Sequence, residues 1–109
     1  MKITVEAATG TIINGGINFV MDVYLNEEIK GWLSIFGKME IEDVPEGENT
    51  ITITVCETRK KEIRLISTQD VHIWVRENQE LNLFKKNYID TLVLGKDVKV
   101  IEEREETRR

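Results

Sequence analysis

The sequence predicts an all-β fold, an antiparallel β-sandwich of the immunoglobulin-like kind, from three observations. Apolar residues alternate with polar ones over many short segments, which is the side-chain period of a strand. The clearest segment is 50–56, where Ile51, Ile53 and Val55 share one face and threonines occupy the other. β-Branched residues fill this segment and fit a pleated surface. Turn residues recur about every 8–12 residues, which is typical of a sandwich. An open β-barrel with a C-terminal helix is the alternative.

The same alternation predicts the other strands, in chain order: Phe19–Leu25, Ile29–Ile35, Met39–Ile41, Ile63–Leu65, Val71–Val75 and a short one at Val98–Val100. Turn-forming residues separate them. We expect turns at Asn26–Glu28, Phe36–Lys38, Pro45–Gly47, Thr58–Lys61, Glu77–Glu80 and Gly95–Asp97.

The segment Leu81–Leu94 fits two structures. Phe84, Tyr88 and Leu92 fall on one helical stripe, with Gly95 as a stop. The alternation at 81–84, together with Thr91 and Val93, favours two short strands, which we prefer. From 102 to 109 every residue but Thr107 is charged. We therefore expect a single domain over residues 1–101 and a disordered charged tail over 102–109.

Composition restricts the function classes. The chain has 109 residues, is 40% apolar and 32% charged, and carries a net charge of −5. These values are typical of one soluble globular domain. A net negative charge argues against binding to nucleic acid, because phosphates would be repelled. No apolar run approaches the roughly 20 residues that span a bilayer, and the N-terminus lacks a signal-peptide pattern. We expect a cytoplasmic protein that binds neither nucleic acid nor membranes.

Two stretches resemble a known family. The stretch 23–31 reads Val-Tyr-Leu-Asn-Glu-Glu-Ile-Lys-Gly, and the stretch 44–53 carries Pro45 and Gly47 before an alternating strand. Together they resemble PEGA-like domains and related small bacterial β-sandwiches over about Phe19–Val55. The shared pattern is a hairpin turn at Asn26, followed by a second turn at Pro45 and Gly47. The resemblance implies a non-catalytic module and no active site.

The sequence offers little for catalysis or metal binding. Cys56 is the one cysteine and His72 the one histidine, so a thiol–imidazole dyad would lack an orienting third group. One His and one Cys cannot supply the four ligands of a structural zinc site. The glycines at 15 and 16 lack the Lys-Ser/Thr of a phosphate-binding loop. Arg59, Lys60 and Lys61 fit a solvated hairpin tip. We expect no enzyme activity, no cofactor and no metal.

One surface is a candidate for binding. Simple alternation turns a set of aromatic residues away from the core, and exposed aromatics usually mark an interface. We therefore expect an interaction module that binds copies of itself or another protein through an aromatic face or a sheet edge. The alternative is a small-molecule or carbohydrate-binding domain that stacks ligands on Trp32 and Trp74. The predicted interaction surface comprises Tyr24, Trp32, Phe36, His72, Trp74 and Phe84.

Overall fold

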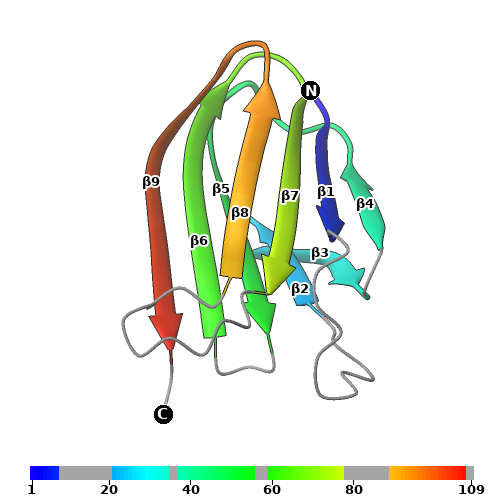
Figure 1. Ribbon diagram of the computed structural model, residues 1–109. Coiled ribbons are helices and arrows are strands. Elements are labelled where there is room, and N and C mark those ends of the chain that lie inside the picture. The colour runs from blue at the N-terminus through cyan, green and yellow to red at the C-terminus, as the bar shows by residue number, and fades with distance from the viewer. Residues whose placement is uncertain (8–20, 35–36, 56–58, 78–88, 108–109) are drawn as a thin grey trace.

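The computed structural model describes residues 1–7, 21–34, 37–55, 59–77 and 89–107 (Figure 1). The elements within these ranges are all strands, which confirms the all-β prediction. They are β1 (Ile3–Ala7), β2 (Met21–Leu25), β3 (Glu28–Leu33), β4 (Lys38–Ile41), β5 (Gly47–Val55), β6 (Arg59–Ser67), β7 (Val71–Glu77), β8 (Ile89–Gly95) and β9 (Val98–Thr107). Helices long and apolar enough to cross a membrane do not occur in the described part of the chain.

The strands form two sheets. The four-stranded sheet has the order β4-β1-β7-β8 and the five-stranded sheet has the order β3-β2-β5-β6-β9. In Figure 1 the four-stranded sheet lies in front of the five-stranded one, with β8 drawn across β5 and β6. Strands adjacent in sequence often change sheet, so each sheet combines segments from both ends of the chain.

The core lies between the two sheets. Its residues come from alternate positions of nearly every strand, as the pattern in β5 predicted: Ile51, Ile53 and Val55 are buried, whereas Thr54 is only partly covered. Alternation works here because successive side chains of a strand point to opposite faces. Each sheet therefore has one inner apolar face and one outer face that is free to carry a function.

β1 was not predicted, and its pairing with β7 departs from the predicted antiparallel arrangement. Ile3 aligns with Val71 and Val5 with Ile73 in a parallel ladder, while the other side of β1 pairs antiparallel with β4. A five-residue strand at a chain start gives only a brief alternation. Its position in the middle of a sheet is set by contacts distant in sequence.

A β-bulge in β3 corrects the predicted side-chain orientation. Simple alternation over the predicted strand Ile29–Ile35 places Ile29 on the core face together with Leu33. In the structure, however, Lys30 has no partner opposite it in β2, where the register shifts. The extra residue turns the side chains of the strand residues that precede it to the opposite face of the sheet. Leu33 is consequently buried, whereas Ile29 joins Trp32 on the outside and is 56% exposed.

A pair of asparagines holds the turn between β2 and β3. The turn was predicted at Asn26–Glu28; in the structure it comprises Asn26 and Glu27, with positive φ angles of 49° and 72°, and β3 begins at Glu28. The Asn26 side chain accepts a hydrogen bond from the backbone N–H of Thr50 at 2.8 Å and donates one to the side-chain amide oxygen of Asn49 at 2.9 Å. Asn49, which is buried, donates in turn to the backbone oxygen of Pro45 at 2.8 Å. The two turns that carry the family resemblance are thus linked through side-chain amides.

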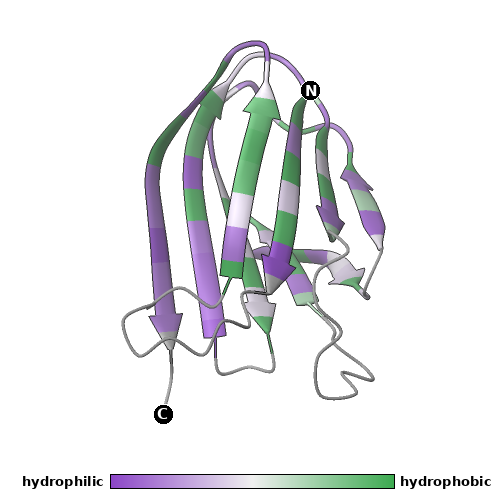
Figure 2. Ribbon diagram, in the orientation of Figure 1, coloured by the Kyte–Doolittle hydropathy of each residue, from purple (hydrophilic) through white to green (hydrophobic). Residues whose placement is uncertain are grey.

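The C-terminal residues differ from the expected disordered tail. Residues 102–107 continue β9 and pair with Arg59–Arg64 of β6. Arg64 lies opposite Glu102, and Glu62 lies opposite Arg104. In this part of the ladder, side chains of opposite charge face each other and β9 contributes no apolar residues. A hydropathy pattern therefore does not reveal this end of the strand. Figure 2 shows this part of β9 as hydrophilic.

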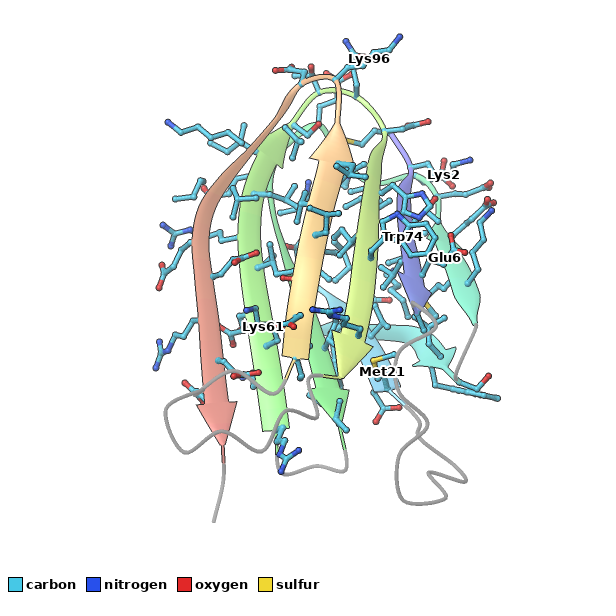
Figure 3. The ribbon with its side chains drawn as sticks, viewed as in Figure 1. Lys2, Glu6, Met21, Lys61, Trp74 and Lys96 are labelled. Atoms are coloured by element: carbon cyan, nitrogen blue, oxygen red, sulfur yellow. The ribbon has the colours of Figure 1, made fainter. Side chains whose placement is uncertain are left out.

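The basic stretch 59–61 is also not a solvated hairpin tip. These residues begin β6, and Lys61 shares the inner face with Ile63 and Leu65. The side chain of Lys61, labelled in Figure 3, is only 6% exposed. Its aliphatic stem lies against the apolar interior, as long basic side chains often do.

We predict that removing residues 102–109 destabilises the protein. The truncation removes six of the nine paired positions of the β6–β9 ladder and the carboxylate of Glu105, which accepts the backbone N–H of Ile89 at 2.7 Å. The loss of several hydrogen bonds, each contributing about 1 kcal/mol, should lower the free energy of unfolding by about 2 kcal/mol or more. Urea denaturation measures this change, with removal of 108–109 alone as the control. Equal unfolding midpoints for the two truncations would show that residues 102–107 contribute nothing to stability.

Candidate interaction face

The outer face of the four-stranded sheet is built from side chains that neighbour one another across the ladders. One row runs from Glu6 to Trp74 to Leu92, because β1, β7 and β8 pair at these positions. The next row runs from Thr4 to His72 to Leu94 in the same registers. Since Ile73 and Val75 of β7 are buried in the core, Trp74 must point outward. The predicted residues His72 and Trp74 are thus brought together.

The β7–β8 half of this face is aromatic and aliphatic. The rings of His72 and Trp74 stack with centroids 5.0 Å apart and planes at 25°. Leu92 is 55% exposed and Leu94 is 47% exposed, in register with Trp74 and His72 respectively. We call these four residues the Trp74 face. Figure 2 shows the corresponding stretch of β8 as hydrophobic.

The β1–β4 half of the face is charged. The Glu40 carboxylate lies 3.7 Å from the Lys2 ammonium and 3.9 Å from that of Lys38. Glu6 Oε1 lies 3.1 Å from His72 Nε2, although the buried Nε2 makes no aligned hydrogen bond. Figure 3 shows Lys2, Glu6 and Trp74 in this part of the molecule. A charged half therefore borders the apolar half directly.

An open depression lies at the end of the face where β1, β7 and β8 meet the adjoining loops. Its volume is about 830 Å³. His72 and Leu94 form its apolar side, so the depression is continuous with the Trp74 face. The charged groups around it are Lys2, Lys38, Glu40, Asp70 and Lys96. Three lysines against two carboxylates leave a positive excess at this end of an acidic protein.

Trp32 lies on a different surface from Trp74. It belongs to β3, at the edge of the five-stranded sheet, where it is 64% exposed. Tyr24 lies opposite Ile29 in the same hairpin and on the same outer face. We call Tyr24, Ile29 and Trp32 the Trp32 knob. The remaining predicted residues, Phe36 and Phe84, lie outside the described residues, as does Cys56.

The rest of the outer face of the five-stranded sheet is dominated by charge pairs. Arg64 contacts Glu48 at 3.0 Å and Glu102 at 3.8 Å. Lys60 and Glu62 are 2.9 Å apart. A second depression, of about 430 Å³, is lined by such charged side chains and by threonines. Exposed ion pairs of this kind contribute little to stability and remain hydrated, which is typical of a surface without a partner.

Each sheet edge within the described residues carries a feature that hinders the addition of another strand. β3 has its bulge, and β4 has four residues with exposed Lys38 and Glu40. β9 is lined with charges. At the β8 edge, Glu105 accepts the backbone N–H of Ile89, and Glu103 accepts the hydroxyl of Thr91 at 3.1 Å. Faces are therefore better suited to binding than edges.

The surroundings of His72 are open. His72 has a carboxylate and an indole as neighbours, and it lies on an open sheet face and not inside a closed pocket. Clusters of three or more metal-ligating side chains do not occur in the part of the chain that the structure describes. What the surface offers is a flat apolar area beside a charged one, which suits a contact with another molecule.

Comparison with protein-family models finds no match, and comparisons with curated proteins and with solved structures find no significant match. The resemblance to PEGA-like domains therefore stays a prediction.

Sequence reasoning missed several members of these surfaces. Leu92 and Leu94 were ambiguous because their segment fits a helix as well as a strand. Ile29 was placed in the core because a bulge leaves no clear signal in a single sequence. The spacing Leu92-Val93-Leu94 before Gly95 could have indicated a strand that is apolar on both faces.

We predict a spectroscopic signature of the stacked rings. The indole of Trp74 should shift the ring protons of His72 upfield in proton NMR, because His72 lies against the aromatic face. His72 is the one histidine, so its signals are unambiguous. Trp74→Ala should return these signals toward the positions seen in the unfolded protein, whereas Ile66→Ala, on the outer face of the other sheet, should leave them unchanged. Unshifted His72 signals in the wild-type protein would contradict the stacking.

Proposed function

We propose that this protein is a non-catalytic interaction module, a β-sandwich that binds protein through the Trp74 face and whose first partner is a second copy of itself. The observation that carries the proposal is the asymmetry between the two outer faces. One carries the exposed side chains of Leu92 and Leu94 beside the half-buried Trp74. The other consists mainly of ion pairs, apart from Trp32 and Ile29 at its β3 edge.

Adjacent apolar groups on a surface favour association because burial removes them from water, at about 25 cal/mol for each Å² buried. Aromatic residues near the centre of an interface contribute disproportionately. Trp74 and His72 are already stacked, and both belong to β7, a strand paired on both sides. Little side-chain entropy would be lost when they are covered, which favours binding.

A second copy is favoured as the partner by charge. The molecule has a net charge of −5, which would oppose contact between two copies at random positions. The face itself is electrically balanced, with three basic and three acidic groups: Lys2, Lys38, Arg76, Glu6, Glu40 and Asp90. Two copies can meet there without like-charge repulsion, and identical chains are the partner always present.

We predict that the wild-type protein associates at micromolar concentration and that Trp74→Ala weakens the association by on the order of thirtyfold, the loss typical of a central tryptophan. Light scattering and sedimentation measure the association. Quenching of tryptophan fluorescence by acrylamide reports whether the indoles become shielded. Ile66→Ala, on the outer face of the other sheet and 43% exposed in the wild type, is the matched control. A wild-type protein that stays monomeric at high concentration would refute self-association.

A second candidate function is the binding of a small polar ligand, such as a carbohydrate, in the depression beside His72. Its volume of about 830 Å³ and its mixed apolar and charged walls favour this reading. Trp32 and Trp74 lie on different sheets. Trp74 does not line the depression but stacks on His72, which does, so Trp74 would sense a bound ligand through His72.

This alternative predicts that simple saccharides change the fluorescence of Trp74 in the Trp32→Ala variant, in which Trp74 is the remaining tryptophan. The change should saturate with saccharide concentration and disappear in Leu94→Lys, which alters a wall of the depression. A response linear in saccharide concentration would indicate a solvent effect and contradict a site.

A further inference from the structure

We propose that the Trp32 knob of one copy contacts the Trp74 face of a neighbouring copy, so that copies associate head to tail. This inference rests on the proposed self-association and identifies the second half of the interface. It follows from the placement of two exposed apolar surfaces on different sheets of one chain.

The first step is that one symmetric contact leaves one of the two surfaces uncovered. In an isologous dimer the same patch meets itself. Pairing of Trp74 faces would leave Trp32 and Ile29 exposed, although they are the two large apolar side chains with the highest exposed fractions among the described residues, at 64% and 56%. A head-to-tail contact uses both surfaces in a single interface.

The second step is shape. The knob lies on a hairpin at the sheet edge that ends in the tight turn at Asn26 and Glu27. Ile29 and Trp32 are exposed on its outer face, and Tyr24 beside them is half-buried. The Trp74 face ends in the depression beside His72 and Leu94. The depression is open, and its volume of about 830 Å³ leaves room for a large aromatic side chain. A protruding side chain and a depression are complementary, whereas two knobs are not.

The third step is charge. The knob is flanked by Asp22, which pairs in register with Trp32, and by Glu27 and Glu28 at the turn, against the single cation Lys30. Two knobs would therefore repel each other. The depression has the opposite excess, because Lys2, Lys38 and Lys96 outnumber its two carboxylates. Head-to-tail contact brings the acidic flank of the knob against these lysines.

The fourth step is backbone geometry. The bulge at Lys30 interrupts the regular spacing of free backbone groups along the β3 edge. Edge-to-edge pairing of two β3 strands is thereby disfavoured, so the knob is suited to contact through its side chains. The Trp74 face also presents side chains, since its strand β7 has a hydrogen-bonded neighbour on each side.

Mixing two variants tests the proposal. Trp32→Ala lacks the knob but keeps the face, and Trp74→Ala lacks the face but keeps the knob. Each variant alone should associate on the order of thirtyfold more weakly than the wild type. Their equimolar mixture should form a heterodimer of one copy of each and stop there, because that dimer has one intact interface and no second. Native mass spectrometry separates the two variants when one is isotopically labelled.

The outcomes distinguish this inference from the proposed function. If Trp32→Ala associates as strongly as the wild type while Trp74→Ala does not, the face binds itself and the head-to-tail inference is wrong, although the proposed function stands. If each variant and their mixture are all monomeric, the two surfaces do not meet, and the inference is again wrong. If the wild-type protein is monomeric, both proposals fail. Ile66→Ala serves as the control for loss of an exposed apolar side chain elsewhere, and circular dichroism verifies that each variant is folded.

Salt provides an independent measurement. Contact between the acidic flank and the lysines should weaken as ionic strength rises, because exposed charges are screened over about 8 Å at physiological salt. Lys96→Glu reverses a charge at the depression and leaves the knob unchanged. This variant should self-associate more weakly than the wild type, and its association should depend less on salt. Association that strengthens with salt in the wild type and is unaffected by this reversal would overturn the charge argument.

Discussion

β1 is held between β4 and β7, and the outer face of the four-stranded sheet depends on that position. β4 is hydrogen-bonded to the rest of the sheet through β1, and β7 reaches β4 only across it. The start of the strand is anchored on both sides: the backbone oxygen of Lys2 accepts the N–H of Val71 at 3.0 Å, and Met1 and Val44 exchange backbone hydrogen bonds at 2.9 and 3.0 Å. The N–H of Lys2 also donates to the Asp70 carboxylate at 2.7 Å. Alternate residues of β1 then place Ile3 and Val5 in the core and Thr4 and Glu6 beside His72 and Trp74.

The same strand therefore contributes to the core and to the surface, and its pairing with β7 restrains the backbone that carries His72 and Trp74. β1 and β7 each have hydrogen-bonded neighbours on two sides, and their inner side chains are fully packed. Their outer side chains project from a backbone that has little freedom left. A binding surface built on such strands loses less entropy on association than a surface built on loops. The Trp32 knob differs, because it lies on an edge strand whose hairpin is fastened by the Asn26–Asn49 amide contacts.

The sequence was sufficient for the parts of the fold that depend on local pattern. Ile51, Ile53 and Val55 were assigned to the core from alternation alone, and the turn at Asn26 was recognised by its residue type. β1 could not be placed, since its partners in β4 lie 32–38 residues away along the chain and its partners in β7 lie 68 residues away. The end of β9 was missed because Glu102, Arg104 and Glu106 pair by charge with β6 and carry no hydrophobic signal.

For the candidate surfaces too, the local pattern predicted some features, whereas others depend on the sheet topology. His72 and Trp74 were placed together correctly, because two residues of one face of one strand are neighbours whatever sheet the strand joins. Tyr24 and Trp32 were likewise turned outward as expected, but alternation does not say which sheet a strand enters. Only the topology shows that the two tryptophans belong to different sheets, and that separation turns one expected aromatic patch into two surfaces.

Two separate surfaces on one chain have a consequence for the size of an assembly. An isologous contact closes at two copies, whereas a head-to-tail contact continues until the rotation between neighbours closes a ring or a filament forms. If the knob and the face meet, each added copy contributes one interface but also a charge of −5, and this repulsion accumulates with length while each interface gains only local contacts. Growth is then opposed at low salt by the whole molecule, although low salt strengthens the contact of the acidic flank with the lysines. The balance favours short or closed assemblies at low ionic strength.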